Sequence, residues 1–152
     1  MKRSKKEAVN FAVLRLPALS VNEGVARAAV AAFCAQLAPT ATELADVKCA
    51  VSEAVTNCVV HAYREREGHF TITVLLFEDR RVRIAVRDRG CGIADVKKAR
   101  EPLFTTDAAG ERSGMGFTVM ESFMDKLSVR SVPGRGTLVV MEKRFAPGAR
   151  RT

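Results

Sequence analysis

Two stretches of alternating residues, 69–77 and 82–88, constrain the fold of this chain more than any other feature. In both of them, HFTITVLLF and VRIAVRD, apolar residues occupy every second position. Side chains along a strand point in turn to opposite faces of the sheet, so this spacing predicts two strands with one buried face each. The polar residues EDRR between the stretches indicate a turn, and we therefore expect a hairpin whose apolar face is covered by helices.

Two helices are expected before this hairpin. Ser20 with Glu23, and Thr40 with Glu43, match the capping-box pattern, in which a hydroxyl and a carboxylate three residues apart close the start of a helix. Pro39 separates the two helices. The second helix carries an apolar stripe along one face, which consists of Val47, Ala50, Val51, Ala54, Val55 and Cys58.

Further elements complete the fold. An alternating strand is expected at 9–16, a helix from about Gly116, and two closing strands at 126–132 and 137–145. The alternating apolar residues of the first strand are Val9, Phe11 and Val13. The order strand, helix, helix, strand, strand, loop, helix, strand, strand predicts an α/β fold, a two-layer sandwich of a mixed β-sheet with helices on one face.

The chain divides simply by composition. Its 152 residues, 47% of them hydrophobic, suit a single domain with a packed core. We expect that domain over residues 9–145, with a basic extension at 1–8 and a basic tail at 146–152. Residues 93–113 show little periodicity, and a loop of that length inside a compact domain is typically functional.

The net charge of +8 is concentrated at the two ends of the chain. Residues 1–7 contribute +3 and residues 143–152 contribute +4, whereas residues 8–142 contribute only +1. A nucleic-acid groove needs a clustered basic face on the body of the domain. We therefore expect no direct binding of nucleic acid, although binding through the tails stays open as an alternative.

The cysteines and the hydropathy indicate a reducing compartment. No apolar run approaches the roughly 20 residues that span a bilayer, and no signal peptide is recognisable, so we expect a cytoplasmic protein without membrane contact. The four cysteines contain no C-x-x-C pair and should be reduced. Cys49 and Cys58 stand among apolar helix positions and are interpreted as small buried thiols. A structural zinc site is not expected.

The helix that starts near Thr40 also carries a polar series. Glu53, Asn57 and His61 recur every four residues, so they stack on one side of the helix, at the margin of its apolar stripe. One acid, one amide and one imidazole in register suggest that a ligand is held there. A solvated helix margin is the alternative interpretation.

Two glycine-containing segments follow. Asp88 ends a strand and precedes Gly90 and Gly92, which allow the backbone to approach a ligand closely. Gly114 and Gly116 stand where the last helix starts, and the free amide groups of a helix N-terminus attract anions. Each pattern alone is common in ordinary turns.

Together the motifs are specific. In chain order they are E-x-x-x-N on a helix, D-x-G-x-G after a strand, a long loop, and G-x-G at a helix start. This constellation resembles the GHKL superfamily of ATP-binding domains. In that superfamily these elements are called the N box, the G1 box, the ATP lid and the G2 box. The stretches VSEAVTN, RDRGCGI, PLFTT and ERSGMGF further resemble the anti-sigma F factors of endospore-forming bacteria, serine kinases related to RsbW.

The resemblance implies ATP or ADP and Mg²⁺ as cofactors, and it implies roles for individual residues. Asn57 would ligate Mg²⁺, Glu53 would be the general base, and Asp88 would accept the adenine amino group. His61 would support the site, and Arg27 of the first helix matches a partner-contacting position. The implied nucleotide contacts are Asn57, Asp88, Gly90, Gly92, Thr105, Thr106, Arg112, Gly114, Met115 and Gly116, with the lid at about residues 93–113.

The function implied by the resemblance is that of an anti-sigma factor and ATP-dependent protein serine kinase. Such a protein binds a sporulation sigma factor of the sigma F type and phosphorylates a serine of its anti-anti-sigma antagonist, usually as a homodimer. A nucleotide-gated binding module without phosphate transfer and a histidine-kinase-type catalytic domain are the alternatives.

Overall fold

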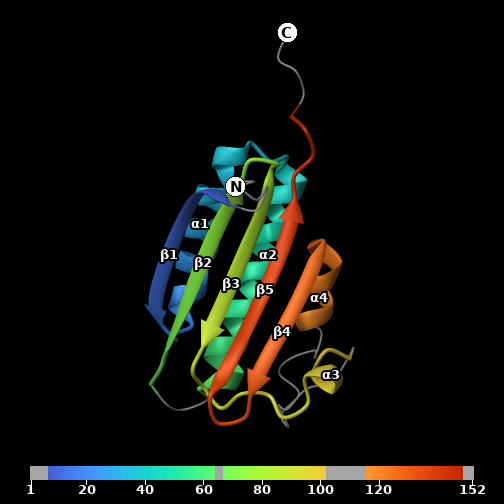
Figure 1. Cartoon of the computed structure of the whole chain (residues 1–152). Helices are drawn as coiled ribbons and strands as arrows, with labels where there is room; N and C mark the ends of the chain where they lie inside the picture. The colour runs from blue at the N-terminus through green and yellow to red at the C-terminus, as the bar shows by residue number, and fades with distance from the viewer. Residues whose placement is uncertain (1–6, 64–66, 102–115, 149–152) are drawn as a thin grey trace.

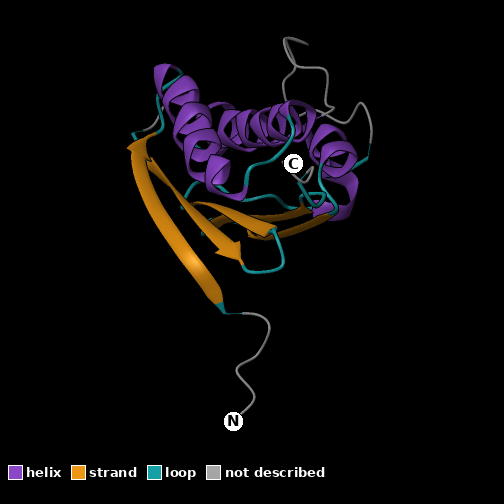
Figure 2. Cartoon of the chain, turned by 90° about the horizontal axis from the view of Figure 1, so that it is seen from above, coloured by secondary structure: helices purple, strands orange, loops and turns teal. Residues whose placement is uncertain are grey.

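The structure is a computed structural model that describes residues 7–63, 67–101 and 116–148. It contains two layers, a twisted sheet and a set of helices that cover one face of it (Figures 1 and 2). The predicted α/β class and two-layer architecture are therefore confirmed.

Five strands form the sheet in the order β1-β2-β3-β5-β4. Their bounds are β1 Ala8–Pro17, β2 His69–Phe77, β3 Arg81–Asp88, β4 Lys126–Val132 and β5 Gly136–Arg144. The expectation of a mixed sheet is corrected, because all four strand pairings in the described residues are antiparallel. The pairs β2–β3 and β4–β5 are hairpins. β2 runs antiparallel to β1, and the chain that connects these two strands, between Pro17 and His69, contains two α-helices.

The helical layer is built around α2, which lies between α1 and α4 (Figure 1). The helical segments are α1 Val21–Cys34, a 3₁₀ turn η1 Ala35–Leu37, α2 Ala41–Asn57, a π-helical turn η2 Cys58–Ala62, α3 Val96–Ala99 and α4 Gly116–Phe123. None of the helices in the described ranges is long and apolar enough to cross a bilayer.

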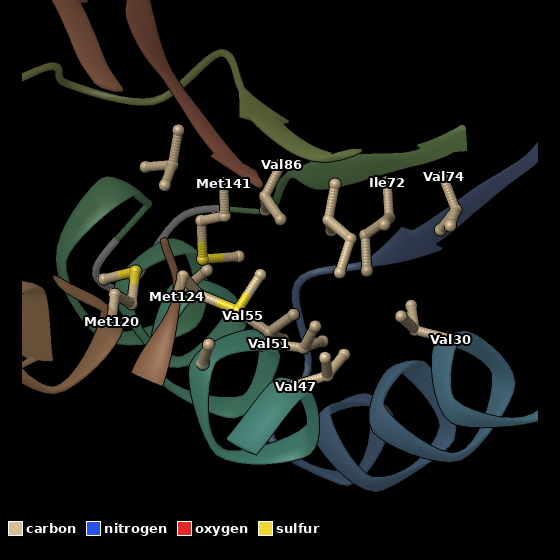
Figure 3. Packing of buried hydrophobic residues seen from close by; sticks show 14 of the residues in the cluster. Val30, Val47, Val51, Val55, Ile72, Val74, Val86, Met120, Met124 and Met141 are labelled. Carbon is tan, nitrogen blue, oxygen red and sulfur yellow. The ribbon is translucent and has the colours of Figure 1, made fainter. Parts of the chain in front are cut away.

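The core fills the space between the two layers. Figure 3 shows Val47, Val51 and Val55 of α2 pointing toward the sheet residues Val86 and Met141. The apolar stripe predicted for this helix is confirmed, since its residues are at most 2% exposed. The alternating residues of β2 and β3 are buried as predicted.

Two expectations about apolar residues are corrected. On β1 the side chains that pack against the core are Leu14 and Leu16, whereas Val9, Phe11 and Val13 are 60–65% exposed. They point to the sheet face that carries no helix, because residues two apart on a strand share a face. Cys49 is exposed rather than buried, since it lies off the stripe of α2, while Cys58 is buried as predicted.

The two predicted capping boxes have different outcomes. Thr40 Oγ1 accepts from the Glu43 amide at 3.1 Å, and Glu43 Oε1 accepts from the Thr40 amide at 2.9 Å, so this box is confirmed. The prediction of a capping box at Ser20 is wrong. Ser20 already has helical backbone angles, its hydroxyl makes no cap hydrogen bond, and Glu23 pairs with Arg27 instead. An N-cap side chain reaches its amide from the extended conformation that Thr40 adopts.

This difference yields a prediction about stability. Thr40→Ala removes the hydroxyl that caps α2 and should lower the free energy of unfolding by about 1 kcal/mol, measured by urea denaturation. Ser20→Ala is the matched control and should change it by only a few tenths, because the Ser20 hydroxyl caps nothing. Equal losses in the two variants would contradict this account of α1 and α2.

Candidate functional site

The end of α2 meets the start of α4. A Cβ placed on Gly116 would lie 3.2 Å from Glu53 Oε2 and 3.5 Å from Asn57 Oδ1. The structure therefore brings together the acid and the amide predicted from the four-residue spacing with the glycine predicted at the helix start. Because residue 116 is glycine, no side chain comes between these two polar groups and the start of α4.

The turn η2 anchors the loop that follows β3. The Cys91 amide donates to the carbonyl of Ala62 at 2.8 Å, and the Cys91 thiol donates to the carbonyl of His61 at 3.2 Å. A Cβ on Gly90 would clash with the same Ala62 carbonyl. Gly90 thus permits the loop to pack directly on the helix backbone. Such π-turns occur frequently at functional sites.

The same loop is held from its other side by the β4–β5 turn. The Gly134 amide donates to the Cys91 carbonyl at 2.8 Å. Gly92 has φ of +74°, and a Cβ there would clash with the backbone of Val132. A residue other than glycine would be strained in that conformation. The loop from Gly90 to Gly92 is therefore fixed between two backbone segments.

Asp88 is the one buried charged residue in the described part of the chain, with 7% of its surface exposed. Its Oδ1 accepts from the amides of Gly90 at 3.0 Å and Thr137 at 3.2 Å. Its Oδ2 lies 3.6 Å from the Cys58 thiol. Burial raises the pKa of the Asp88 carboxyl, although these three hydrogen bonds act in the opposite direction.

Two residues of this site were not predicted from the sequence. Thr137 reaches Asp88 through the register of β5 against β3, where the two residues stand opposite each other. Its hydroxyl is 2.8 Å from Ser131 Oγ, which also accepts from the Ile93 amide at 2.7 Å. Cys58 was interpreted only as a core thiol. Burial and the Asp88 carboxylate raise the pKa of this thiol, so it keeps its proton.

The remaining predicted residues are reported one by one. His61 is on η2, where its backbone carbonyl accepts from the Cys91 thiol of the Gly90–Gly92 loop. Arg27 is exposed on α1, on the other side of α2 from α4, where its guanidinium pairs with Glu23 at 3.2 Å (Figure 1). The predicted contacts Thr105, Thr106, Arg112, Gly114 and Met115 fall outside the described residues.

The donor atoms suit a magnesium ion only together with a ligand. Within the described ranges no three His, Cys, Asp or Glu residues are grouped to hold a metal. Asn57 Oδ1 and Glu53 Oε2 are hard oxygen atoms, the type that Mg²⁺ prefers, and both lie close to Gly116 at the start of α4. Mg²⁺ commonly takes one or two protein oxygens and completes its shell with water and phosphate. The residues present fit that arrangement.

Comparison with known proteins agrees with this geometry. Residues 16–143 match the family described as histidine kinase-like ATPase domain. The chain is 55% identical over 134 residues to the anti-sigma F factor of Caldanaerobacter subterraneus subsp. tengcongensis. This alignment covers 88% of this chain and 93% of that protein. It is 52% identical over 134 residues to the anti-sigma F factor of Bacillus subtilis, with 88% and 91% covered.

Solved structures share the fold. The crystal structure of the RsbU and RsbW domains of a Mycobacterium tuberculosis protein aligns with a TM-score of 0.69 at 21% identity, over 95% of this chain and 35% of that one. The histidine kinase domain of a blue-light activated histidine kinase from Erythrobacter litoralis aligns with a TM-score of 0.54 at 18% identity, over 81% of this chain and 61% of that one.

The buried carboxylate predicts an unusual effect of substitution. Asp88→Asn keeps an oxygen for the Gly90 and Thr137 amides but removes a buried charge. Because the folded state holds the Asp88 proton more tightly than the unfolded chain, burial weakens the wild-type fold above the raised pKa. Asp88→Asn should therefore raise the free energy of unfolding at pH 7.

The same measurement as a function of pH provides the check. The gain from Asp88→Asn should disappear as the pH falls below the ordinary carboxyl pKa. Asp79→Asn is the matched control: burial raises the pKa of Asp79 slightly, but Arg144 and Arg81 outweigh it and lower that pKa. Its substitution should lower stability at pH 7, again with no effect in acid. A clear loss of stability in Asp88→Asn at pH 7 would contradict this view of the site.

Proposed function

This chain belongs to the anti-sigma F factor family, whose members carry a histidine kinase-like ATPase domain, and on that premise we propose that it is also an ATP-dependent protein serine kinase. It binds and inhibits a sporulation sigma factor of the sigma F type. It transfers the γ-phosphate of ATP to a serine of its anti-anti-sigma antagonist, and it does so in the cytoplasm.

One observation carries the proposal: Glu53 and Asn57 both lie against Gly116, the first residue of α4. Phosphoryl transfer requires positioning and neutralisation of charge, together with a group that accepts the proton of the attacking hydroxyl. An amide oxygen, a carboxylate and a helix N-terminus at one place supply these parts.

The amide and the helix end hold the phosphates. Asn57 Oδ1 would hold Mg²⁺, which neutralises phosphate charge when bound. α4 begins at Gly116, beside these two side chains, and the free amides of a helix N-terminus favour negative charge. Gly114 and Met115, together with Thr105, Thr106 and Arg112 of the lid at about 93–113, are assigned further phosphate contacts by resemblance.

Glu53 acts on the substrate rather than on the nucleotide. Its Oε2 lies one helical turn before Asn57 and on the same side of α2. A carboxylate there can accept the proton of a serine hydroxyl as that hydroxyl attacks the γ-phosphate. General-base assistance of this kind contributes typically about 10²–10⁴-fold to a rate.

The base is recognised at the other end of the site. Asp88 Oδ1 is occupied by two backbone amides, so Oδ2 is the oxygen that can accept from the adenine amino group. Gly90 and Gly92 fix the loop beside it. Asp88 thus distinguishes adenine from bases that present a carbonyl oxygen at that position.

Partner contacts are assigned to surfaces away from the nucleotide. Arg27 is 46% exposed in its side chain on α1, and its ion pair with Glu23 is of the weak surface type. It can therefore exchange Glu23 for an acidic group of a partner at small cost. We assign residues 9–145 to the kinase domain. We assign the basic ends of the chain no role in binding either partner.

The kinase assignment predicts a specific loss of phosphate transfer. Purified protein with γ-labelled ATP should place label on a serine of the antagonist encoded beside its gene, and Glu53→Gln should reduce the rate at least 10²-fold. The affinity for ATP should change little in that variant, because Glu53 acts on the hydroxyl. The measurements are autoradiography and calorimetric titration with ATP.

The outcomes separate the alternatives. Tight binding of ATP with no label on the antagonist would favour the nucleotide-gated binding module. Acid-labile label on a histidine would favour a histidine-kinase-type activity instead of the acid-stable phosphoserine. Asn57→Ala is the companion variant, and it should lose the magnesium-dependent part of ATP binding, which Glu53→Gln keeps.

Homodimerisation is proposed through the outer face of β1. Val9, Phe11 and Val13 are 60–65% exposed on an edge strand, and such an apolar stripe is typical of an interaction surface. Phe11→Asp should therefore convert a dimer to a monomer in sedimentation velocity. Val25→Asp on α1, 51% exposed, is the control and should remain dimeric. A dimer that survives Phe11→Asp would place the interface elsewhere.

A further inference from the structure

Cys58 lies against the carboxylate that recognises the base. It is the first residue of η2 and is 2% exposed. Its Sγ is 3.6 Å from Asp88 Oδ2 and 3.5 Å from the carbonyl oxygen of Ala54. The thiol carries a proton, so it can donate to either oxygen. No role in the proposed chemistry of this site has yet been given to this side chain.

The two oxygens of Asp88 have different surroundings. Oδ1 accepts from two backbone amides, one of the loop after β3 and one of β5. For Oδ2, the one hydrogen bond found within the described residues comes from Cys58. A carboxylate oxygen has room for two donors, so a single thiol leaves one position on Oδ2 available to a ligand.

We propose that Cys58 is a positioning residue for base recognition: its thiol donates to Asp88 Oδ2 and fixes the plane of the carboxylate, so that the same oxygen accepts from the amino group of adenine. This inference rests on the proposed function, in which Asp88 binds the base of ATP. The amides at Oδ1 hold one end of the carboxylate, and the thiol holds the other.

The chemistry of a thiol suits this task. S–H is a weak donor, so it orients the carboxylate without satisfying the oxygen that must bind the ligand. A lysine or arginine at the same place would pair with Asp88 and compete with the base. Cys58 is also positioned by the same turn η2 whose Ala62 carbonyl holds the Gly90–Cys91 backbone. Side chain and loop therefore share one support.

The competing explanation is that Cys58 only fills the core. Cys34 provides the matched comparison, because it is a fully buried thiol of the same core cluster. It is located on α1, and within the described residues it has no hydrogen bond to Asp88. A packing role predicts that the two thiols behave alike. A positioning role predicts that only Cys58 affects which base is bound.

The experiment is calorimetric titration of the wild type, Cys58→Ala and Cys34→Ala with ADP and with IDP, whose base carries a carbonyl oxygen in place of the amino group. The wild type should prefer ADP. Cys58→Ala should reduce that preference by about 2- to 10-fold, the effect expected for one hydrogen bond, with the affinity for IDP nearly unchanged. Cys34→Ala should keep the wild-type preference.

Three results would count against the idea or against its premise, and they are distinguishable. An unchanged preference in Cys58→Ala, or an equal loss of ADP and IDP affinity, overturns the positioning role. A wild type that binds no ADP overturns the proposed function itself. If Cys58→Ala does not fold, infrared difference spectra of the wild type decide: ADP, but not IDP, should shift a thiol stretching band that is missing in Cys58→Ser.

Discussion

The buried carboxylate of Asp88 is the constraint on which the rest of the structure depends. Its hydrogen bonds join the loop after β3, strand β5 and turn η2, three segments far apart in the sequence. Burying a charge without a cationic partner is costly unless donors surround it. The amides of Gly90 and Thr137 supply those donors, and so the carboxylate determines how the sheet, the loop and the helical layer meet.

Close backbone contacts complete this arrangement. A Cβ on Gly90 would clash with Ala62, and one on Gly136 would clash with the carbonyl of Asp88. The end of the site that holds Asp88 is therefore built from backbone packed on backbone. At the other end, Glu53 and Asn57 lie against Gly116. One end thus presents a fixed carboxylate, and the other brings an acid and an amide to the start of α4.

The sequence predicted the places in the fold of those candidate residues that depend on local spacing. Glu53 and Asn57 require only a helix, and Asp88 requires only the end of an alternating strand. Thr137 and Cys58 were missed because their contacts depend on the register of β5 against β3 and on a π-turn, which local periodicity does not specify. The prediction of a mixed sheet was wrong for a related reason, because the direction of a strand depends on the path that the chain takes between strands. Similarly, Ser20 matched a capping pattern, but its backbone conformation prevents the cap.

A stability argument connects these observations with function. A buried carboxylate whose pKa is raised by burial weakens the fold at neutral pH, and an asparagine could satisfy the same amides. A destabilising group at a proposed binding site fits the general trade-off between stability and activity. α2 is capped at Thr40, and its residues Val47, Val51 and Val55 are buried in the core. These contacts stabilise the helix whose other end bears the site. Packing of α2 in the helical layer therefore offsets the cost at Asp88, which ends β3 in the sheet, while Val9, Phe11 and Val13 remain exposed on β1.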